Sequence, residues 1–266
     1  MSCSNLVQIA RRLRIGQICN RLMSALFTGL VFVGMALAEE FPQNIDGDIG
    51  LGAFFTRSIV RSKANHASVL PYAYFSYERV FIRLDTVGVK TWKLGYGYLE
   101  IAGRYSQDGF DADAGSLAGL KNRQTSIPLG IGTLQITPIG AFFINAFHDV
   151  NKSTGNLFEV IYAGKLQASP LTFYPMLGAE YRSKEYVRYY CGVSPQEAAN
   201  SQYAAYHPAG AFIPLIGLAA DAKLTDGYYV NFYLRRRWLP GSIHDSPIVN
   251  QKFQDTGYVA LSYRFK

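Results

Sequence analysis

Alternation of apolar and polar side chains with a period of two is the feature that most constrains the fold of this chain. In residues 257–265, Val259, Leu261, Tyr263 and Phe265 fall on one face of an extended strand, and Tyr258, Ala260, Ser262 and Arg264 fall on the other. An apolar face ending on an aromatic residue, with an arginine on the opposite face, is typical of the last strand of an outer-membrane barrel. Such barrels usually end on the aromatic residue itself, whereas here Lys266 follows it.

The first 38 residues have the features of a secretory signal, so residues 39–266 are predicted to form the mature chain. Arg11, Arg12, Arg14 and Arg21 supply a positive region, residues 22–37 an apolar region, and residues 36–38 a small-x-small cleavage site. The apolar region is 16 residues long, shorter than the roughly 20 that a spanning helix needs. Removing four arginines and no acids lowers the formal charge from +7 to +3, so the charge does not indicate a nucleic-acid partner. The mature chain keeps one cysteine, Cys191, which excludes an intramolecular disulfide.

Alternating segments continue through the mature chain, and counting them gives twelve. The predicted strands are 49–57, 69–77, 80–85, 87–94, 96–105, 125–133, 135–148, 157–168, 171–188, 209–224, 228–238 and 257–265. Long connectors alternate with tight ones, except for one short connector near Thr86 where a long one is due. Bacterial outer-membrane barrels have this plan, with an even strand number and both termini in the periplasm. We therefore predict an all-β fold, a single antiparallel transmembrane β-barrel of about 12 strands, or ten if residues 80–94 form one strand.

Charged residues recur on the faces opposite the apolar ones, and we expect them to line the barrel lumen. They are Glu100, Arg104, Glu159, Lys165, Glu180, Arg182, Arg235 and Arg237. Burying such charges in the core of a soluble sandwich is prohibitive unless all are paired, which favours the barrel. Three interpretations remain open: ion pairs that fill a narrow barrel, an arginine-rich wall that selects anionic solutes, or a closed lumen with the loops as the binding surface.

No residue set predicts catalysis, a cofactor or a metal site. The local combinations that a hydrolase would need are His148-Asp149 and His244-Asp245, with Ser242 and Ser246 nearby. Nothing in their spacing brings a nucleophile and a base together, so we interpret them as polar loop residues. Asp108, Asp111 and Asp113 lack the twelve-residue calcium-loop pattern and its closing glutamate, and we expect a solvated loop there. We expect Cys191 to be a buried, inert thiol.

Two segments resemble a known family. The first runs through Tyr190, Gly192, Val193, Ser194 and Pro195 to Glu197-Ala198, and the second, Arg237 to Val249, contains Asp245, Ser246 and Pro247. Together with the ending at residues 262–265, they resemble the MltA-interacting protein / outer-membrane protein V (MipA/OmpV) family. Departures are Cys191, where an aromatic residue is usual, and the extra Lys266.

The resemblance implies a non-catalytic scaffold in the bacterial outer membrane, surrounded by outer-membrane lipid. Its implied partners are a lytic transglycosylase and a penicillin-binding protein, and some relatives are described as adhesins or antigens. The family provides no catalytic residues to carry over. Its matched segments fall in connectors that the predicted topology places outside, whereas murein enzymes work in the periplasm. Either these loops form a plug, or a partner recognises the periplasmic rim. The alternative function is a narrow diffusion porin or a surface adhesin.

Overall fold

The computed structural model describes residues 41–112 and 115–266, and the predicted signal segment, 1–38, lies outside them. The strands are β1 Asp46–Thr56, β2 His66–Tyr77, β3 Val80–Arg83, β4 Thr86–Leu94, β5 Gly97–Arg104, β6 Leu129–Thr137, β7 Gly140–His148, β8 Asn156–Ala163, β9 Leu166–Ala168, β10 Leu171–Arg182, β11 Ala211–Thr225, β12 Tyr228–Trp238 and β13 Phe253–Phe265. Short helices lie between them: η1 Gly115–Leu117, α2 Lys184–Cys191, α3 Pro195–Asn200 and α4 Gly241–His244. None of the helices in the described ranges is long and apolar enough to span a membrane.

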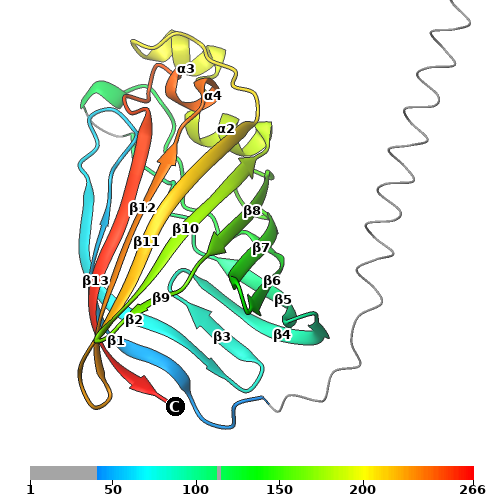
Figure 1. Cartoon of the computed structure of the whole chain (residues 1–266). Coiled ribbons are helices and arrows are strands. Elements are labelled where there is room, and N and C mark those ends of the chain that lie inside the picture. The colour runs from blue at the N-terminus through cyan, green and yellow to red at the C-terminus, as the bar shows by residue number, and fades with distance from the viewer. Residues whose placement is uncertain (1–40, 113–114) are drawn as a thin grey trace, which may run out of the picture. The chain divides into compact units, whose positions relative to one another are not determined.

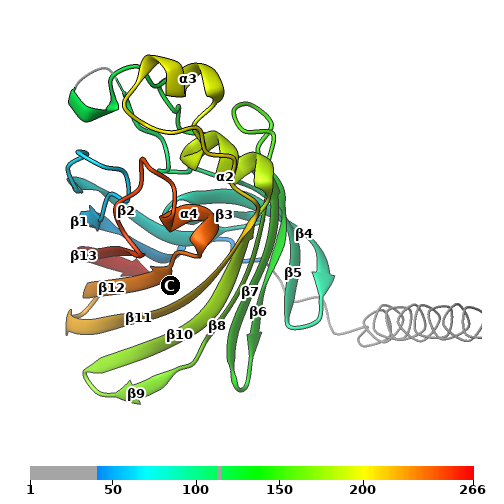
Figure 2. The same ribbon diagram turned by 90° about the horizontal axis from the view of Figure 1, so that it is seen from above.

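The strands form one closed antiparallel ring (Figures 1 and 2). Neighbours in sequence pair with each other, and the first and last strands, β1 and β13, pair over Gly47–Thr56 and Thr256–Phe265. Because β8 and β9 both pair with β10, at successive positions along it, they form one interrupted strand. The ring therefore has twelve strands, and the sequence prediction of a 12-stranded barrel is confirmed.

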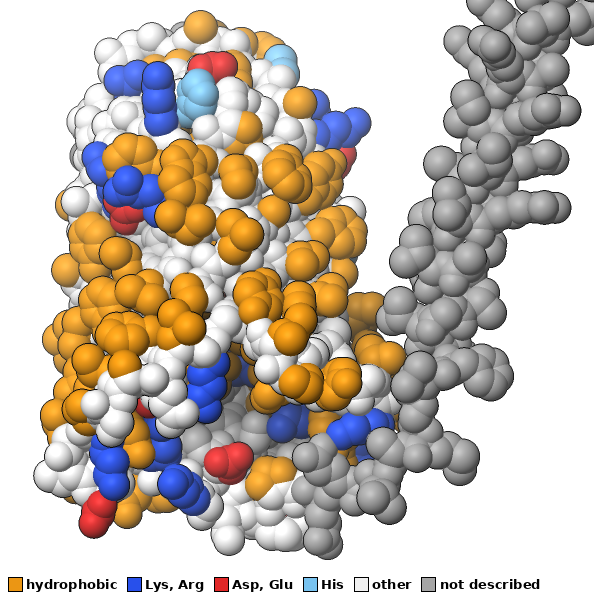
Figure 3. Space-filling view, in the orientation of Figure 1, with side chains coloured by type: hydrophobic (Ala, Val, Ile, Leu, Met, Phe, Trp, Pro, Cys, Tyr) orange, Lys and Arg blue, Asp and Glu red, His pale blue; other side chains and the backbone are white. Residues whose placement is uncertain are grey.

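Exposure alternates along the strands as the sequence pattern predicted. On β13, Val259 and Leu261 are 50% and 53% exposed, whereas Ala260 and Ser262 are 1% and 2% exposed. A band of hydrophobic side chains crosses the face of the barrel, and most charged side chains lie above or below it (Figure 3). Lipid can cover such a band, while the strand ladders satisfy the backbone hydrogen bonds that the hydrocarbon region cannot.

The two ends of the barrel differ. Tight turns and the C-terminus lie at one end, and the long connectors with α2, α3 and α4 lie at the other (Figure 1). In bacterial outer-membrane barrels the terminus-bearing end faces the periplasm, so we call these the periplasmic end and the outer end. The space-filling surface is hollowed near the periplasmic end, with charged side chains in and beside the hollow (Figure 3).

Several strand ends differ from the prediction by a few residues, such as the start of β13 at Phe253 instead of 257, and three differences are larger. The turn expected near residue 134 lies at 138–139, because Pro138 has no N–H for the ladder and Gly130 and Gly132 leave the faces of β6 hard to assign. The strand expected to reach residue 188 ends at Arg182, and α2 follows. The predicted strand 157–168 is interrupted at 164–165. The short connector near Thr86 is a tight turn at 84–85, as predicted.

Candidate functional site: the outer cap and the charged lumen

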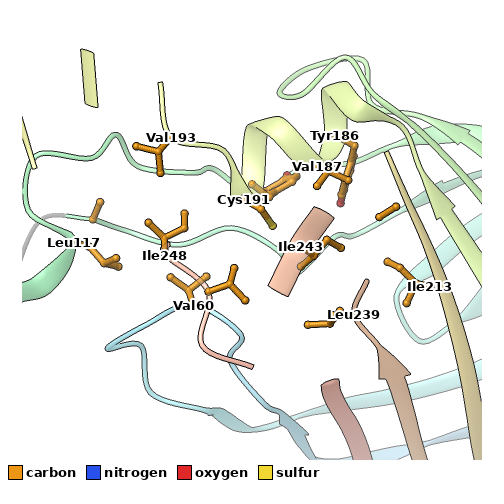
Figure 4. Packing of buried hydrophobic residues seen from close by; sticks show 14 residues of the cluster. Val60, Leu117, Tyr186, Val187, Cys191, Val193, Ile213, Leu239, Ile243 and Ile248 are labelled. Carbon is orange, nitrogen blue, oxygen red and sulfur yellow. The ribbon is translucent and has the colours of Figure 1, made fainter. Parts of the chain in front are cut away.

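The long connectors at the outer end pack on one another and form a cap with its own hydrophobic core. The cap comprises residues 57–65, the described parts of 105–128, 149–155, 183–210 and 239–252. Its most buried apolar residues come from four of these loops and from the start of β11: Val60, Ala112, Leu117, Tyr186, Val187, Tyr190, Cys191, Val193, Ala211, Ile213, Leu239, Ile243, Ile248 and Val249. Figure 4 shows these side chains around a shared interior beside α2 and α4. Burying one large aliphatic side chain contributes roughly 1.5–3 kcal/mol, so the loops stabilise each other.

The two family-like segments meet inside this cap. Ser246 Oγ donates a hydrogen bond to the carbonyl oxygen of Cys191 at 2.6 Å, and both residues are buried. Val193 exchanges two backbone hydrogen bonds with Tyr206, at 3.0 and 2.8 Å. Arg61 Nε donates to the carbonyl oxygen of Pro247 at 2.7 Å, which joins the first long loop to the last. The segments therefore hold the cap together.

Ser194 and Pro195 begin α3, and Glu197 fixes that helix to the neighbouring loop. Ser194 and Glu197 form a capping box, in which the backbone N–H of Ser194 donates to Glu197 Oε2 at 3.0 Å. The other oxygen, Oε1, accepts from the backbone N–H of Lys121 at 3.0 Å and from Arg123 at 2.7 Å. Burial of Glu197 opposes its ionisation, but these donors outweigh burial and lower its pKa to about 2.

The histidine and serine candidates do not assemble a catalytic set among the described residues. His148 Nδ1 contacts Asn156 Oδ1 at 2.8 Å, while the carboxylate of Asp149 accepts from the Ser153 hydroxyl and from backbone N–H groups of its own turn. His244 and Asp245 are in contact at 2.8 Å, and Asp245 ends the short helix α4. A nucleophilic triad also requires a serine or cysteine next to the histidine, and the described contacts of His148 and His244 include no such residue.

Asp108 does not lie in a solvated loop, contrary to the prediction. Its carboxylate pairs with Arg182 at 3.2 Å and accepts from the Tyr186 hydroxyl at 2.8 Å. Asp111 is exposed, and Asp113 lies outside the described residues. Over the described ranges, no group of three or more His, Cys, Asp or Glu residues is arranged to hold a metal ion. Asp108 acts instead as a link between the cap and the barrel wall.

Seven of the eight residues expected in the lumen lie in three buried ion-pair groups. Glu100 accepts two hydrogen bonds from Arg83, both at 2.7 Å. Glu159 accepts two from Arg104, at 3.2 and 2.9 Å, and one from Asn145 at 3.0 Å. The third group is centred on the buried carboxylate of Glu180, which lies 2.7 Å from Arg237, 3.3 Å from Arg182 and 3.7 Å from Arg235.

The eighth residue, Lys165, is exposed in the break between β8 and β9 and belongs to none of these groups. Several partners in the lumen were not predicted: Arg83, Asn145 and the triad of Arg264 with Asp48 and Asp221. Arg83 and Arg264 alternate with apolar neighbours, so period two alone gives their face. The identity of their partners follows from strand register, which the sequence does not show.

Comparison with known proteins gives the family. The family model described as "MltA-interacting protein MipA" matches residues 49–265, nearly the whole barrel. The chain belongs to the MltA-interacting protein family. The protein YiaT of Escherichia coli (strain K12) is 25% identical over 92% of this chain and 99% of its own length.

Two further relatives of this MipA-family chain bear on its location and partners. The MltA-interacting protein of Escherichia coli (strain K12) is 24% identical over 67% of this chain and 73% of its own length. The outer membrane protein OmpV of Vibrio cholerae serotype O1 is 27% identical over 68% of this chain and 67% of its own length. These names and the barrel agree with the predicted location, and the chain is a bacterial outer-membrane protein. None of the three relatives is named as an enzyme.

Proposed function

We propose that this MipA-family barrel is a non-catalytic binding protein that holds a murein-modifying enzyme at its periplasmic end. The observation that carries the proposal is the contrast between the two ends. The family segments at the outer end are engaged in the core of the cap, with Tyr190, Val193 and Ser246 each less than 5% exposed. The opposite end, which faces the compartment of murein enzymes, is hollowed (Figure 3).

The periplasmic rim offers side chains that suit a protein partner. Trp92, Tyr96 and Ile139 are exposed by 72%, 63% and 72% at or beside the tight turns. The segment before β1 is fixed along the same rim, because the backbone N–H of Glu78 donates to the carbonyl oxygen of Pro42 at 2.8 Å and Arg79 lies 4.5 Å from the centre of the Phe41 ring. Exposed aromatic residues beside basic ones are enriched in protein interfaces.

The relative named MltA-interacting protein supports a lytic transglycosylase as the partner, and a penicillin-binding protein is the second partner we propose. The test is recovery of both enzymes from detergent-solubilised envelopes on the tagged full-length protein. We expect enrichment over an unrelated barrel of similar size. Tyr96→Ala combined with Ile139→Ser should lower recovery at least several-fold, whereas Gln196→Ala on the outer helix α3 should not. Equal recovery on the unrelated barrel would refute the proposal.

A narrow porin is the second candidate, and the lumen supplies the observation that favours it. Arg182, Arg235 and Arg237 surround a single carboxylate, and the buried Nε atoms of Arg182 and Arg235 have no hydrogen-bond acceptor among the described residues. Such a group attracts anions. Planar-bilayer recording separates the two functions, because a porin gives discrete, anion-selective conductance steps and a closed binding barrel gives none.

A further inference from the structure

The barrel wall has a lateral notch beside β2. Along one edge, β2 pairs with β1 over His66–Ser76. Along the other edge, β2 pairs with β3 over Tyr74–Tyr77 alone, because β3 is four residues long. No described strand covers the second edge from residue 66 to residue 73, which is roughly 26 Å at about 3.3 Å per residue. The notch is bounded below by the turn at 84–85 and above by Gln107, which lies 3.5 Å from Thr56.

The free edge of β2 faces the notch with its backbone polar groups. The carbonyl oxygen of Ala73 accepts from the backbone N–H of Leu84, so the polar groups of Ala73 point toward the notch side. The backbone polar groups of every second residue in a strand point the same way, so those of Pro71, Val69 and Ala67 also point toward the notch. Pro71 has no N–H, so it leaves no unpaired donor there and discourages an added strand. The notch therefore does not suit strand addition from another chain.

The notch lies at membrane depth. Outward side chains on both of its sides are apolar and exposed: Val69 by 74%, Val87 by 53% and Leu129 by 51%. The inward residue Leu70 is also 45% exposed, unlike inward residues of the fully paired wall such as Ala260 and Ser262. Unpaired strand edges do not occur in contact with hydrocarbon unless water or a polar group reaches them. The occupant of the notch must therefore carry both apolar and polar parts.

A row of neighbouring side chains leads from Leu70 along the inner wall to Arg235. Tyr72 follows on the same face, with its ring 5.4 Å from that of Tyr258, and Tyr258 stacks on Tyr233 at 5.2 Å. The guanidinium of Arg235 lies 6.0 Å from the centre of the Tyr233 ring. The nearest carboxylate to Arg235 is 3.7 Å away, and its buried Nε has no hydrogen-bond partner among the described residues. The row thus runs from aliphatic through aromatic to cationic groups.

We propose that the notch is a lateral portal through which an anionic membrane lipid enters the barrel wall. Its hydrocarbon chain lies along Leu70, Tyr72 and Tyr258, and its anionic head group approaches Arg235. Water that enters with the lipid hydrogen-bonds the free backbone edge of β2. The surrounding bilayer supplies this occupant at the depth where the wall is incomplete.

Fluorescence quenching by lipids with brominated acyl chains tests the portal. The chain has two tryptophans, which are replaced in the variant Trp92→Phe, Trp238→Phe. Leu70→Trp in this background reports the notch, and Leu51→Trp, at an outward position that is 63% exposed, reports full lipid contact. Phe143→Trp is the matched inward control, because β7 is paired on both sides, with Leu134 and Ile161 opposite Phe143.

We expect brominated lipid to quench Leu70→Trp nearly as strongly as Leu51→Trp and to leave Phe143→Trp bright. Brominated phosphatidylglycerol should quench Leu70→Trp more than brominated phosphatidylcholine does, and Arg235→Gln should remove that preference. Ser68→Trp, on the same inward face, replaces Leu70→Trp if the latter does not show the heat-modifiable mobility of a folded barrel. Quenching of Leu70→Trp no greater than that of Phe143→Trp would overturn the portal, and quenching without head-group preference would overturn the anionic ligand.

Discussion

Cys191 belongs to the first family segment and contacts Ser246 of the second, and its burial determines its reactivity. The side chain is 5% exposed in the core of the cap, and burial raises its thiol pKa to about 12. Since the thiolate is the reactive form, we expect maleimide to leave the folded protein unlabelled at pH 7.5 and to label it fully after denaturation. Mass spectrometry before and after denaturation checks this. Labelling at equal rates in both states would contradict a packed cap.

Glu197 makes the cap sensitive to acid. Because its pKa is lowered to about 2, its ionised form stabilises the cap at neutral pH, and this contribution is lost as the pH falls from about 4.3, the unfolded value, toward 2. Glu197→Gln should therefore weaken hydrogen-exchange protection of α3 at pH 7 by on the order of 2 kcal/mol. The difference from wild type should shrink toward pH 2. Glu185→Gln, on the surface of α2, is the control; a pH-independent difference would show that Glu197 acts through packing alone.

Side-chain direction was predictable for most lumen residues, but side-chain partners were not. Period-two alternation gives the face of Glu180 and Arg237 directly from the chain. The pairing of Glu180 with Arg235 and Arg237 depends on the register of the three strands β10, β11 and β12, which no local pattern specifies. Asp108 was misassigned for the same reason, because its partners Arg182 and Tyr186 lie 74 and 78 residues away in sequence.

Among the elements, the strands were easier to predict than the helices of the cap. The helix α2 buries Tyr186, Val187, Tyr190 and Cys191, a helical spacing that follows directly on a strand and so is easily taken for its continuation. The sequence does indicate the start of α3, because Ser194 and Glu197 have the spacing of a capping box and Pro195 occupies the first helical position. The interruption between β8 and β9 had none, because Gly164 and Lys165 fit the alternation on either side.

The lipid-facing side of β13 gives a prediction at the scale of one strand. Leu261 is paired with Leu51 and Val230 and is 53% exposed within the apolar band. Leu261→Arg should lower the free energy of unfolding in bilayers by about 2–4 kcal/mol, because a charge at the membrane midplane is costly. Leu224→Arg, near the tight turn at 226–227, should cost about 0–1 kcal/mol. Guanidinium titration in lipid vesicles measures both, and equal costs would contradict the assigned depth.

At the scale of the whole molecule, alternation of connector length predicted which end carries the loops. It did not predict that the loops fold into a cap with a shared core, because that core joins residues as distant as Val60 and Val249. The lateral notch has a local origin, because the strand of four residues, β3, follows directly on the strand of twelve, β2.

The orientation of the two ends is the central claim, because the proposed periplasmic partner depends on it. Gln196 is exposed on α3, and Asp226 is exposed at the tight turn between β11 and β12. In intact cells, a membrane-impermeant maleimide should label Gln196→Cys and leave Asp226→Cys unlabelled until the outer membrane is permeabilised, with wild type as the blank. Labelling of Asp226→Cys but not Gln196→Cys in intact cells would place the cap in the periplasm and contradict the account.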